Sequence, residues 1–290
     1  MPEGIIVKAY GGFFYVWENG QQRECVLRGR LRREKQPVLV GDRVSFTLRP
    51  ENAGVIEQVL PRRTALVRPP VANVERAVIT GAGRDPAPNP LLIDRFLIQA
   101  AAAGVLPLLC FNKMDLGPGE AAEQIAGYRL AGYTVLCTSA VTGDGIGELQ
   151  AQLQTGISVL AGPSGVGKSS LLNALNPGWS LKTGAISRKL GRGKHTTRHV
   201  ELLPLPGGGL VADTPGFSSL YLPELTREEL AGFYPEIAWR QAACRFTGCL
   251  HVSEPGCAVK EAVAAGEIAP WRYENYQILL QEVLIQERRY

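Results

Sequence analysis

One segment of the chain combines the residue types and the spacing that bind phosphate: Gly162, Pro163, Ser164, Gly165, Val166, Gly167, Lys168, Ser169 and Ser170. An apolar run over residues 157–160 precedes it and an amphipathic helix pattern continues to residue 175, which is the context such a loop requires. Its glycines let backbone N–H groups close around a β-phosphate, and the helix N-terminus adds its dipole. Lys168 would bridge the β- and γ-phosphates, and the Ser169 hydroxyl would bind Mg²⁺. The alternative, a glycine-rich loop that binds no ligand, does not explain why Lys168 and Ser169 follow the glycines at this spacing.

A carboxylate follows at the spacing expected for the same site. Asp213 comes after the apolar run 210–212 and begins the string Asp213-Thr214-Pro215-Gly216. At a strand end, Asp213 would hold a Mg²⁺-bound water, and the Gly216 N–H would donate to a γ-phosphate. On its own this tetrapeptide is a weak signal. Its position downstream of a phosphate loop makes it a strong indication of the γ-phosphate side of a nucleotide site.

A third segment, Asn112-Lys113-Met114-Asp115, has the residues that read guanine. Guanine presents two adjacent donors, N1–H and N2–H₂, and the Asp115 carboxylate can accept both, whereas adenine offers no matching pair. Asn112 would anchor the base through its amide, and Lys113 would pack over the ring and sugar. A backbone N–H of the string Thr138-Ser139-Ala140 would donate to guanine O6. Asp115 therefore disfavours an ATP-dependent kinase or ATPase built on the same phosphate loop.

The order of these segments is reversed relative to an ordinary GTPase, in which the phosphate loop comes first and the base-reading segment last. The sequence therefore predicts a central α/β GTPase whose elements are circularly permuted. Strand and helix patterns alternate, which predicts a parallel sheet with ligand loops at the strand ends. The expected strands are 74–80, 105–111, 134–137, 157–160 and 210–212, and the expected helices are 91–103, 120–130 and 168–175.

Residues 182–198 contain six basic residues and no acidic one, together with three glycines. This composition predicts a switch segment that orders when a γ-phosphate and Mg²⁺ bind. One of Thr196 and Thr197 would be the second Mg²⁺ ligand, and Thr197 is assigned that role. With Lys168, these threonines and His195 are the candidate catalytic residues, although a lone histidine is more often structural. Phe217 stands where many GTPases place a water-orienting glutamine, so intrinsic hydrolysis should be slow and a partner should complete the site.

Three cysteines and one histidine lie within fourteen positions: Cys244, Cys249, His251 and Cys257. Three thiolates and an imidazole suit a closed tetrahedral Zn²⁺ with no position left for substrate, so a structural zinc is expected. Metal binding would fold a region with few apolar residues. A redox pair of Cys244 and Cys249 is the alternative, and His251 argues against it. The other cysteines lie in apolar runs and are expected to be buried thiols: Cys25, Cys110 and Cys137.

Residues 1–68 show five short strand patterns separated by turn signals: 4–10, 13–18, 23–27, 42–48 and 55–59. Five strands in so short a segment predict a small closed barrel, and the OB-fold, which commonly binds nucleic acid, has that number. Phe13, Tyr15 and Trp17 are expected in the barrel core. For Phe14 both possibilities stay open, a core position or an exposed ring on which a base could stack. Residues 61–70 are expected to form a linker without regular structure.

The net charge of +4 is concentrated in residues 1–68, which contain twelve Lys and Arg against seven Asp and Glu. Five basic residues cluster there: Arg28, Arg30, Arg32, Arg33 and Lys35. Such a positive field favours phosphate backbones, although a single run of this kind can also be a solvated loop.

With 290 residues, 45% hydrophobic and 20% charged, the chain is long enough for two or three globular domains. We expect an all-β OB-fold barrel over 1–68, the permuted P-loop GTPase domain over 69–225 and a mainly helical zinc domain over 226–290. No apolar run reaches the ~18–20 residues that span a bilayer, and the N-terminus lacks a signal-peptide pattern, so a cytoplasmic location is expected.

Taken together, the motifs resemble those of the ribosome small-subunit-dependent GTPases, circularly permuted bacterial GTPases that act in late assembly of the small ribosomal subunit. The resemblance covers nearly the whole chain, and these segments carry it: Val40-Gly41-Asp42, 112–115, 162–170, 191–198, 213–217 and 244–257. It implies GTP hydrolysis stimulated by the small subunit, and the nucleotide, magnesium and zinc roles given above. It also implies a catalytic histidine at His195.

On this resemblance, GTP would order residues 182–198 into a form that docks on 16S ribosomal RNA, and hydrolysis would release a monomeric protein. The barrel and the zinc domain would grip the RNA on either side of the nucleotide site, so binding should depend strongly on salt. A function of another class stays open, namely a nucleotide-gated regulator that binds a protein partner. Charge reversal over residues 28–35 and in the basic switch segment should abolish ribosome association only in the first case.

Overall fold

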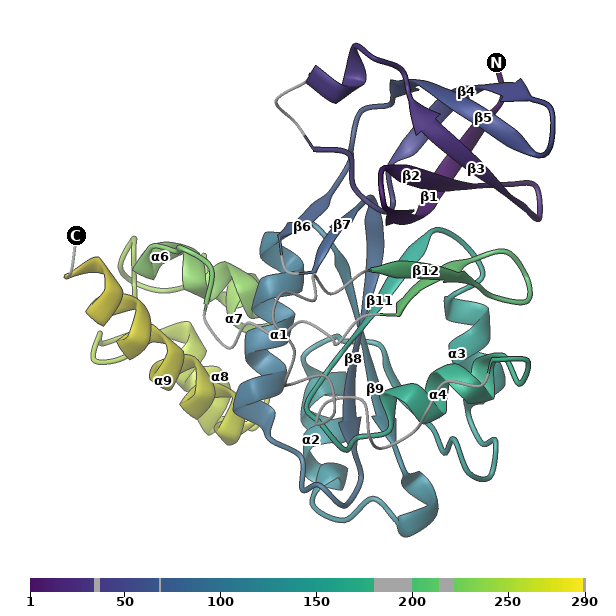
Figure 1. Ribbon diagram of the computed structural model, residues 1–290. Coiled ribbons are helices and arrows are strands. Elements are labelled where there is room, and N and C mark those ends of the chain that lie inside the picture. Colours follow the sequence, from purple (N-terminus) through teal and green to yellow (C-terminus); the bar gives the residue numbers. More distant parts are fainter. Residues whose placement is uncertain (34–36, 68, 180–199, 214–221, 289–290) are drawn as a thin grey trace, which may run out of the picture.

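The computed structural model describes residues 1–33, 37–67, 69–179, 200–213 and 222–288. Figure 1 shows three parts: strands at the N-terminal end, a sheet flanked by helices in the middle, and a group of C-terminal helices beside α1. Among the described helices, none is both long and apolar enough to cross a lipid bilayer.

Five strands of the described chain form the N-terminal barrel: β1 (Glu3–Tyr10), β2 (Phe13–Glu18), β3 (Gln21–Leu27), β4 (Arg43–Arg49) and β5 (Ala53–Val59). They pair in the order β1-β2-β3-β5-β4, and β1 also pairs with β4, which closes the barrel. Side chains on alternating positions are buried inside it, among them Ile6, Val16, Val44, Phe46 and Ile56. The expected OB-like barrel is confirmed.

The aromatic residues of β2 differ in part from the expectation. Phe13 is 42% exposed, so its assignment to the core is wrong. It pairs with Tyr10 next to the turn between β1 and β2. Tyr15 and Trp17 are half-buried and pack against the barrel core, as does Phe14.

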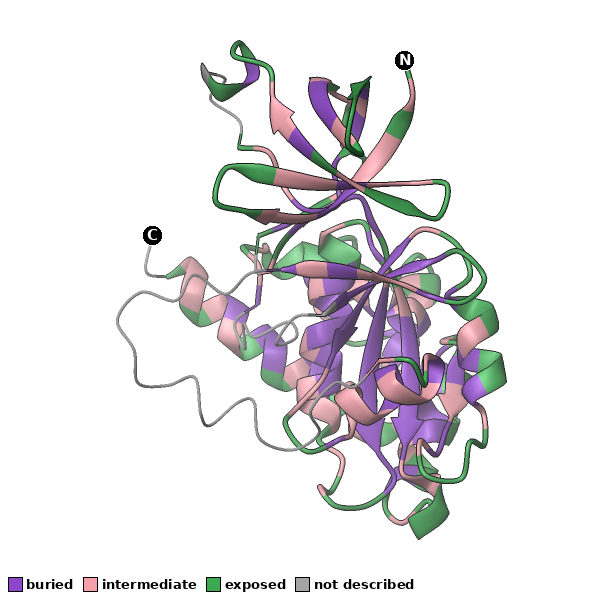
Figure 2. Cartoon of the chain, turned by 45° about the vertical axis from the view of Figure 1, so that its right-hand side comes forward, coloured by how far each residue is buried: buried purple, intermediate pink, exposed green. Residues whose placement is uncertain are grey.

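Six described strands form the central sheet, in the order β10-β9-β8-β11-β13-β12. Their bounds are β8 (Val74–Ala82), β9 (Leu106–Asn112), β10 (Val135–Cys137), β11 (Ile157–Ala161), β12 (Glu201–Pro204) and β13 (Leu210–Asp213). All are parallel except β12, which runs antiparallel to β13. Because helices cover both faces, these strands are nearly continuous apolar runs, and Figure 2 shows most of their length as buried.

Two helices pack on each face of this sheet. Helix α1 (Pro90–Ala102) and helix α2 (Ala121–Leu130) bury apolar residues on one face, while α3 (Ile146–Gln152) and α4 (Lys168–Leu175) do so on the other. Asn89 caps α1 by accepting from the Leu92 N–H at 3.0 Å, and Pro90 occupies its first turn. A short 3₁₀ helix, η2 (Met114–Leu116), follows β9.

Several short elements were not expected from the sequence. Helix α3, strand β12 and the 3₁₀ helix η1 (Leu31–Arg33) fall in segments for which no element was predicted. The linker prediction for residues 61–70 is wrong in part, because β6 (Ala65–Val67) and β7 (Pro70–Ala72) form a hairpin there. Pro70 is tolerated because it begins an edge strand.

The C-terminal part is helical, as expected: α6 (Arg227–Leu230), η3 (Ala231–Phe233), α7 (Pro235–Gln241), α8 (Ala258–Ala264) and α9 (Pro270–Glu287). These helices bury their own apolar core, in which Tyr276, Leu279 and Leu280 of α9 are inaccessible to solvent. Ile98 of α1 belongs to this second core. Helix α1 therefore packs on the sheet with one side and on the C-terminal helices with another.

Candidate functional site

The phosphate-binding loop connects the C-terminal end of β11 to α4. Gly162, Gly165 and Gly167 have backbone φ angles of 137°, 88° and 93°. Residues other than glycine rarely adopt these angles. Lys168 begins α4, and its Nζ donates to the carbonyl oxygens of Gly162 at 2.7 Å and Pro163 at 2.8 Å. Burial lowers the pKa of Lys168. The ammonium group thus contacts the first two residues of the loop, and phosphate oxygens could replace these carbonyl oxygens as its hydrogen-bond acceptors.

Close packing at two of these glycines fixes where the loop lies. A Cβ on Gly162 would stand 2.2 Å from the Thr80 carbonyl oxygen at the end of β8, and one on Gly167 would stand 2.4 Å from Asn112 Nδ2. Glycine is therefore required at both positions for contact as well as for backbone angle.

Asn112 joins the base-reading segment to the phosphate loop. Its side chain is 2% exposed, and Nδ2 donates to the Val166 carbonyl at 2.9 Å. Its Oδ1 accepts from the Ala140 N–H at 3.1 Å and the Thr138 hydroxyl at 3.4 Å. One amide therefore holds together three segments that lie far apart in the sequence.

Asp115 is exposed and is held by a buried serine. Ser139 Oγ donates to Asp115 Oδ1 at 2.6 Å and accepts from the N–H groups of Val141 at 3.3 Å and Thr142 at 3.1 Å. Because those N–H groups occupy the oxygen's acceptor positions, the hydroxyl hydrogen is directed at the carboxylate. The other carboxylate oxygen stays available for a base.

Lys113 makes a contact that sequence reasoning missed. It has a left-handed backbone, with φ of 62°, and its Nζ donates to the carbonyl oxygen of Asp85. Asp85 belongs to the segment 83–89 between β8 and α1, which no motif marks. The Gly83 N–H donates to the Asn112 carbonyl at 2.9 Å, so this segment borders the base-reading side of the site.

Some expected site residues cannot be placed in this geometry. His195, Thr196, Thr197, Gly216 and Phe217 lie outside the described residues. The backbone of Asp213 ends β13, beside β11 in the parallel sheet and therefore at the same edge as the phosphate loop. Ser169 and Ser170 lie in the first turn of α4 and are half-buried.

A second cluster lies in the C-terminal part, where ligand atoms of Cys244, Cys249, His251 and Cys257 all lie within 4.8 Å of one another. His251 Nδ1 is 3.6 Å from Cys244 Sγ and 3.4 Å from Cys257 Sγ, and the two sulfurs are 3.9 Å apart. Bond lengths of about 2.3 Å to sulfur and 2.0 Å to nitrogen place neighbouring ligands of tetrahedral zinc about 3.5–3.8 Å apart. Burial lowers the pKa of His251, which favours the neutral imidazole that ligates metals. The residues could hold a metal ion.

Surrounding groups fix this loop. Glu254 accepts from the N–H groups of Leu250, Val252 and Ser253 at 2.9–3.0 Å. Partial burial raises the pKa of Glu254, but these backbone hydrogen bonds outweigh it and hold the pKa below its usual value. From α9, the Tyr273 hydroxyl donates to the His251 carbonyl at 2.6 Å, and Tyr276 donates to the Leu250 carbonyl at 3.0 Å. The cluster is thus attached to α9 through backbone carbonyls.

Comparison with known proteins matches two family descriptions to this chain. The RsgA N-terminal domain matches residues 3–56, and the RsgA GTPase matches residues 59–223. Among relatives, a protein of Moorella thermoacetica is 50% identical over 288 residues, covering 99% of both chains. One from Geobacillus kaustophilus is 49% identical over 294 residues and covers the whole of both. Both are named small ribosomal subunit biogenesis GTPase RsgA.

Solved structures agree with this match. YloQ, described as a circularly permuted GTPase, superposes with a TM-score of 0.84 at 38% identity and covers 100% of this chain and 97% of its own. YjeQ from Thermotoga maritima gives 0.83 at 40% identity and covers 98% of each chain. In the present sheet, β8, β9 and β10 likewise precede β11 and the phosphate loop in the sequence. The chain is a circularly permuted GTPase and belongs to the RsgA GTPase family.

Proposed function

We propose that this GTPase acts in the biogenesis of the small ribosomal subunit, and that it hydrolyses GTP to GDP and phosphate faster when bound to that subunit. The observation that carries the proposal is the match along the whole chain, at about half identity, to relatives named for this role. The basic barrel and the switch segment 182–198 would contact 16S ribosomal RNA.

For guanine recognition, we assign Asp115 to N1–H and N2–H₂ of the base and Ser139 to holding that carboxylate, which its 2.6 Å hydrogen bond supports. The Ala140 N–H donates to Asn112 at present and would be shared with guanine O6. Lys113 would leave the Asp85 carbonyl to pack over the ring and sugar. These contacts select GTP over ATP because adenine lacks the paired donors.

For hydrolysis, Lys168 would exchange its two carbonyl contacts for oxygens of the β- and γ-phosphates, and backbone N–H groups of residues 162–170 would surround the β-phosphate. Ser169 and Thr197 would hold magnesium, which when bound neutralises charge on the phosphate oxygens. Asp213 and Gly216 would complete the γ-phosphate side. His195, with Thr196, is the candidate for positioning the attacking water.

In the C-terminal part, the spacing of the four ligand atoms supports one structural zinc ion held by Cys244, Cys249, His251 and Cys257. Three thiolates and an imidazole leave no open position, so no chemistry is assigned to this metal. Its role would be to fix the loop over residues 244–257 against α9.

Two of the basic residues that the sequence marked for RNA contact in the barrel already have partners within the protein. Arg28 forms an ion pair with Glu57, and Arg30 donates to the Glu57 carbonyl at 2.8 Å. Arg32 is exposed, and Phe13 lies exposed close by, both lining a surface hollow beside the Gly11-Gly12 turn. We propose that this region contributes cationic and stacking contacts to single-stranded ribosomal RNA.

Sedimentation with purified small subunits tests the RNA contact. Replacing Arg30 and Arg32 by Glu should weaken co-sedimentation in the presence of a non-hydrolysable GTP analogue. The slope of log affinity against log salt should also become shallower, by about one for each phosphate that the variant no longer neutralises. The matched control replaces Arg43 and Arg49 of β4 by Glu, which gives the same change of net charge elsewhere on the barrel. Equal weakening in both variants would mean that only net charge matters, and unchanged binding in both would reject the contact.

We further propose that the protein works as a monomer in the cytoplasm, where it would meet assembling subunits. Analytical ultracentrifugation of the free protein at micromolar concentration checks the oligomeric state, and a dimer would contradict it.

A further inference from the structure

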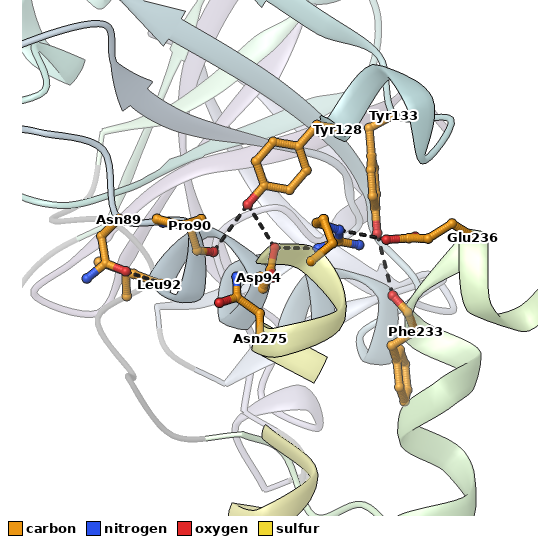
Figure 3. Close-up of polar contacts among 10 residues, drawn as sticks. Asn89, Pro90, Leu92, Asp94, Tyr128, Tyr133, Phe233, Glu236 and Asn275 are labelled. Atoms are coloured by element: carbon orange, nitrogen blue, oxygen red, sulfur yellow. Dashed lines mark hydrogen bonds and ion pairs between the residues drawn. The ribbon is translucent and has the colours of Figure 1, made fainter. Parts of the chain in front are cut away.

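A charged cluster that the nucleotide chemistry does not use lies between the GTPase helices and the C-terminal helices (Figure 3). Arg272 of α9 donates from Nη1 to Asp94 of α1 at 2.5 Å and from Nε to Glu236 of α7 at 2.7 Å. The three side chains are 2%, 0% and 3% exposed. Asn275 adds a hydrogen bond to Asp94 Oδ2 at 2.7 Å. A buried ion pair adds little stability over an apolar core of equal volume, so its role is to be sought in the geometry it imposes.

Aromatic rings surround the guanidinium of Arg272. Its Cζ lies 4.4 Å from the ring centroid of Tyr234, 5.2 Å from Tyr128, 5.6 Å from Tyr133 and 5.9 Å from Trp271. Tyr128 and Tyr133 belong to the GTPase part, and the other two rings belong to the C-terminal part. The cation therefore attracts groups from both sides of the junction.

The position of Tyr128 and Tyr133 in the chain links this cluster to guanine recognition. Tyr128 lies in the last turn of α2 and Tyr133 in the connection to β10, and the Tyr133 N–H donates to the Tyr128 carbonyl at 3.0 Å. Helix α2 follows the base-reading segment 112–115, and β10 leads into the second such segment, 138–140. The turn that contacts Arg272 is therefore one element away from each segment.

Tyr128 also lies against the strand that leads into the first base-reading segment. Its ring centroid is 6.4 Å from that of Phe111, the residue before Asn112. Its hydroxyl donates to Asp94 Oδ1 at 2.8 Å and lies 3.2 Å from the Pro90 carbonyl, at the start of α1. Burial raises the pKa of Tyr128 well above its ordinary value, so the hydroxyl stays protonated as a donor. Tyr128 thus joins α2, α1 and the end of β9.

Two glycines in or beside this turn pack closely against tryptophan rings. A Cβ on Gly127 would stand 2.6 Å from Trp271 Cζ2, and one on Gly132 would stand 2.7 Å from Trp239 Cη2. Both tryptophans come from the C-terminal helices. Helix α2 and the turn that follows it are therefore in close contact with the C-terminal part.

We propose that Arg272 is a positioning residue for guanine recognition: it holds Tyr128 and Tyr133 and thereby fixes the separation of the segments that carry Asp115 and Ser139. The inference rests on the proposed guanine site and adds to it a residue of the C-terminal part that touches no nucleotide. Loss of Arg272 weakens selection of the base and leaves the phosphate chemistry of Lys168 intact.

Base discrimination in the free protein, measured without ribosomal subunits, tests the proposal. Inosine diphosphate lacks the 2-amino group that Asp115 accepts, so the wild-type protein should bind GDP about tenfold or more tightly than inosine diphosphate. Arg272→Met should reduce this preference to about threefold or less and raise KM for GTP, while kcat at saturating GTP stays within about twofold. Arg272→Lys should give an intermediate preference, because an ammonium cannot bind both carboxylates as a planar fork does.

Arg95→Met is the matched control. Arg95 of α1 pairs with Glu282 of α9 across the same junction, and Glu282 lies ten residues along α9 from Arg272. This variant should keep the wild-type preference. If it loses the preference as Arg272→Met does, or if both Arg272 variants keep the preference, the positioning role is rejected. If a thermal melt shows that Arg272→Met is not folded, the nucleotide preference of Arg272→Lys alone tests the proposal.

A failure of the underlying guanine site is recognised separately. Asp115→Asn should abolish the preference for GDP over inosine diphosphate. If it does not, the base site itself is wrong; if it does while Arg272→Lys and Arg272→Met behave like wild type, only the role of Arg272 fails.

Discussion

At the scale of single residues, the side chains proposed to read guanine are held in place by hydrogen bonds within the site. Asn112 is bonded through both ends of its amide, and Ser139 directs its hydroxyl at Asp115. Such preorganisation lowers the entropy that must be lost when a base binds. Lys113 and Lys168 both donate to backbone carbonyls, and in the proposed function they would need only to exchange those partners for the nucleotide.

Candidate roles could be assigned to these residues from the sequence because each motif is compact and its chemistry is local. The contacts between motifs could not be predicted. Asn112 reaches Val166 across 54 positions and Lys113 reaches Asp85 across 28, and neither partner contributes a side-chain atom to the contact. Any residue can supply a backbone carbonyl, so the sequence carries no signal for it.

The residue-scale prediction concerns Asp115. Replacing it with Asn should weaken GDP binding by roughly tenfold or more, because an amide accepts through one oxygen and presents a donor to the guanine 2-amino group. Xanthosine diphosphate carries a carbonyl at that position and should bind the Asp115→Asn variant better than it binds wild type. Fluorescence titration with the two nucleotides measures both changes, and an unchanged order of preference would contradict the assignment.

At the scale of elements, α1 packs on two cores at once. Ile93 and Phe96 lie against the central sheet, while Ile98 lies in the core of the C-terminal helices. Its expected bounds, 91–103, differ by one residue at each end from those observed, because a long amphipathic pattern with a capping residue is a strong signal. Helix α3 and strand β12 were missed because they are too short to show a period and, unlike the equally short β13, neither leads into a motif. Tertiary packing stabilises them instead, as the buried Ile146 and Leu149 of α3 show.

An element-scale prediction compares two glycines in helices. Gly127→Ala should lower the free energy of unfolding by about 1–3 kcal/mol, because its Cβ would overlap Trp271. Gly147→Ala in α3 meets no atom within 4 Å and should raise it, by up to about 1 kcal/mol, through helix propensity. Thermal unfolding followed by circular dichroism measures both, and equal shifts of Tm would contradict the close packing at Gly127.

The metal-binding loop gives a second element-scale prediction. Purified protein should contain about one zinc per chain, and Cys257→Ala should lose most of it because a closed site needs all four ligands. Cys137→Ala, which changes a half-buried thiol of β10 outside the cluster, should keep its zinc. Elemental analysis gives the content, and hydrogen exchange over residues 244–257 should rise only in the first variant. Zinc retained by Cys257→Ala would contradict the assigned ligand set.

At the scale of the whole molecule, the barrel and the central sheet are continuous. Strand β1 pairs with β12 at Lys8 and Glu201, whose side chains form a half-exposed ion pair at 3.3 Å. Strand β12 directly follows the expected switch segment 182–198. The basic barrel therefore adjoins the strand into which that segment leads.

Three parts of the right class could be predicted from the sequence, because strand, helix and metal-ligand patterns change along the chain. Their docking could not. Nothing in the sequence distinguishes Arg272 from the other arginines in helices. Its partners Asp94 and Glu236 lie in segments that contain no motif. Which faces of preformed elements meet depends on shape and on buried charge pairs, and neither leaves a periodic trace.

The measurement that tests the central claim most directly is GTP turnover with and without purified small ribosomal subunits at two salt concentrations. The account predicts slow turnover by the protein alone, a clear stimulation by small subunits at low salt, and loss of that stimulation at high salt as phosphate contacts are screened. Turnover that is equally fast with and without subunits at both salt concentrations, with no co-sedimentation in any nucleotide state, would contradict it.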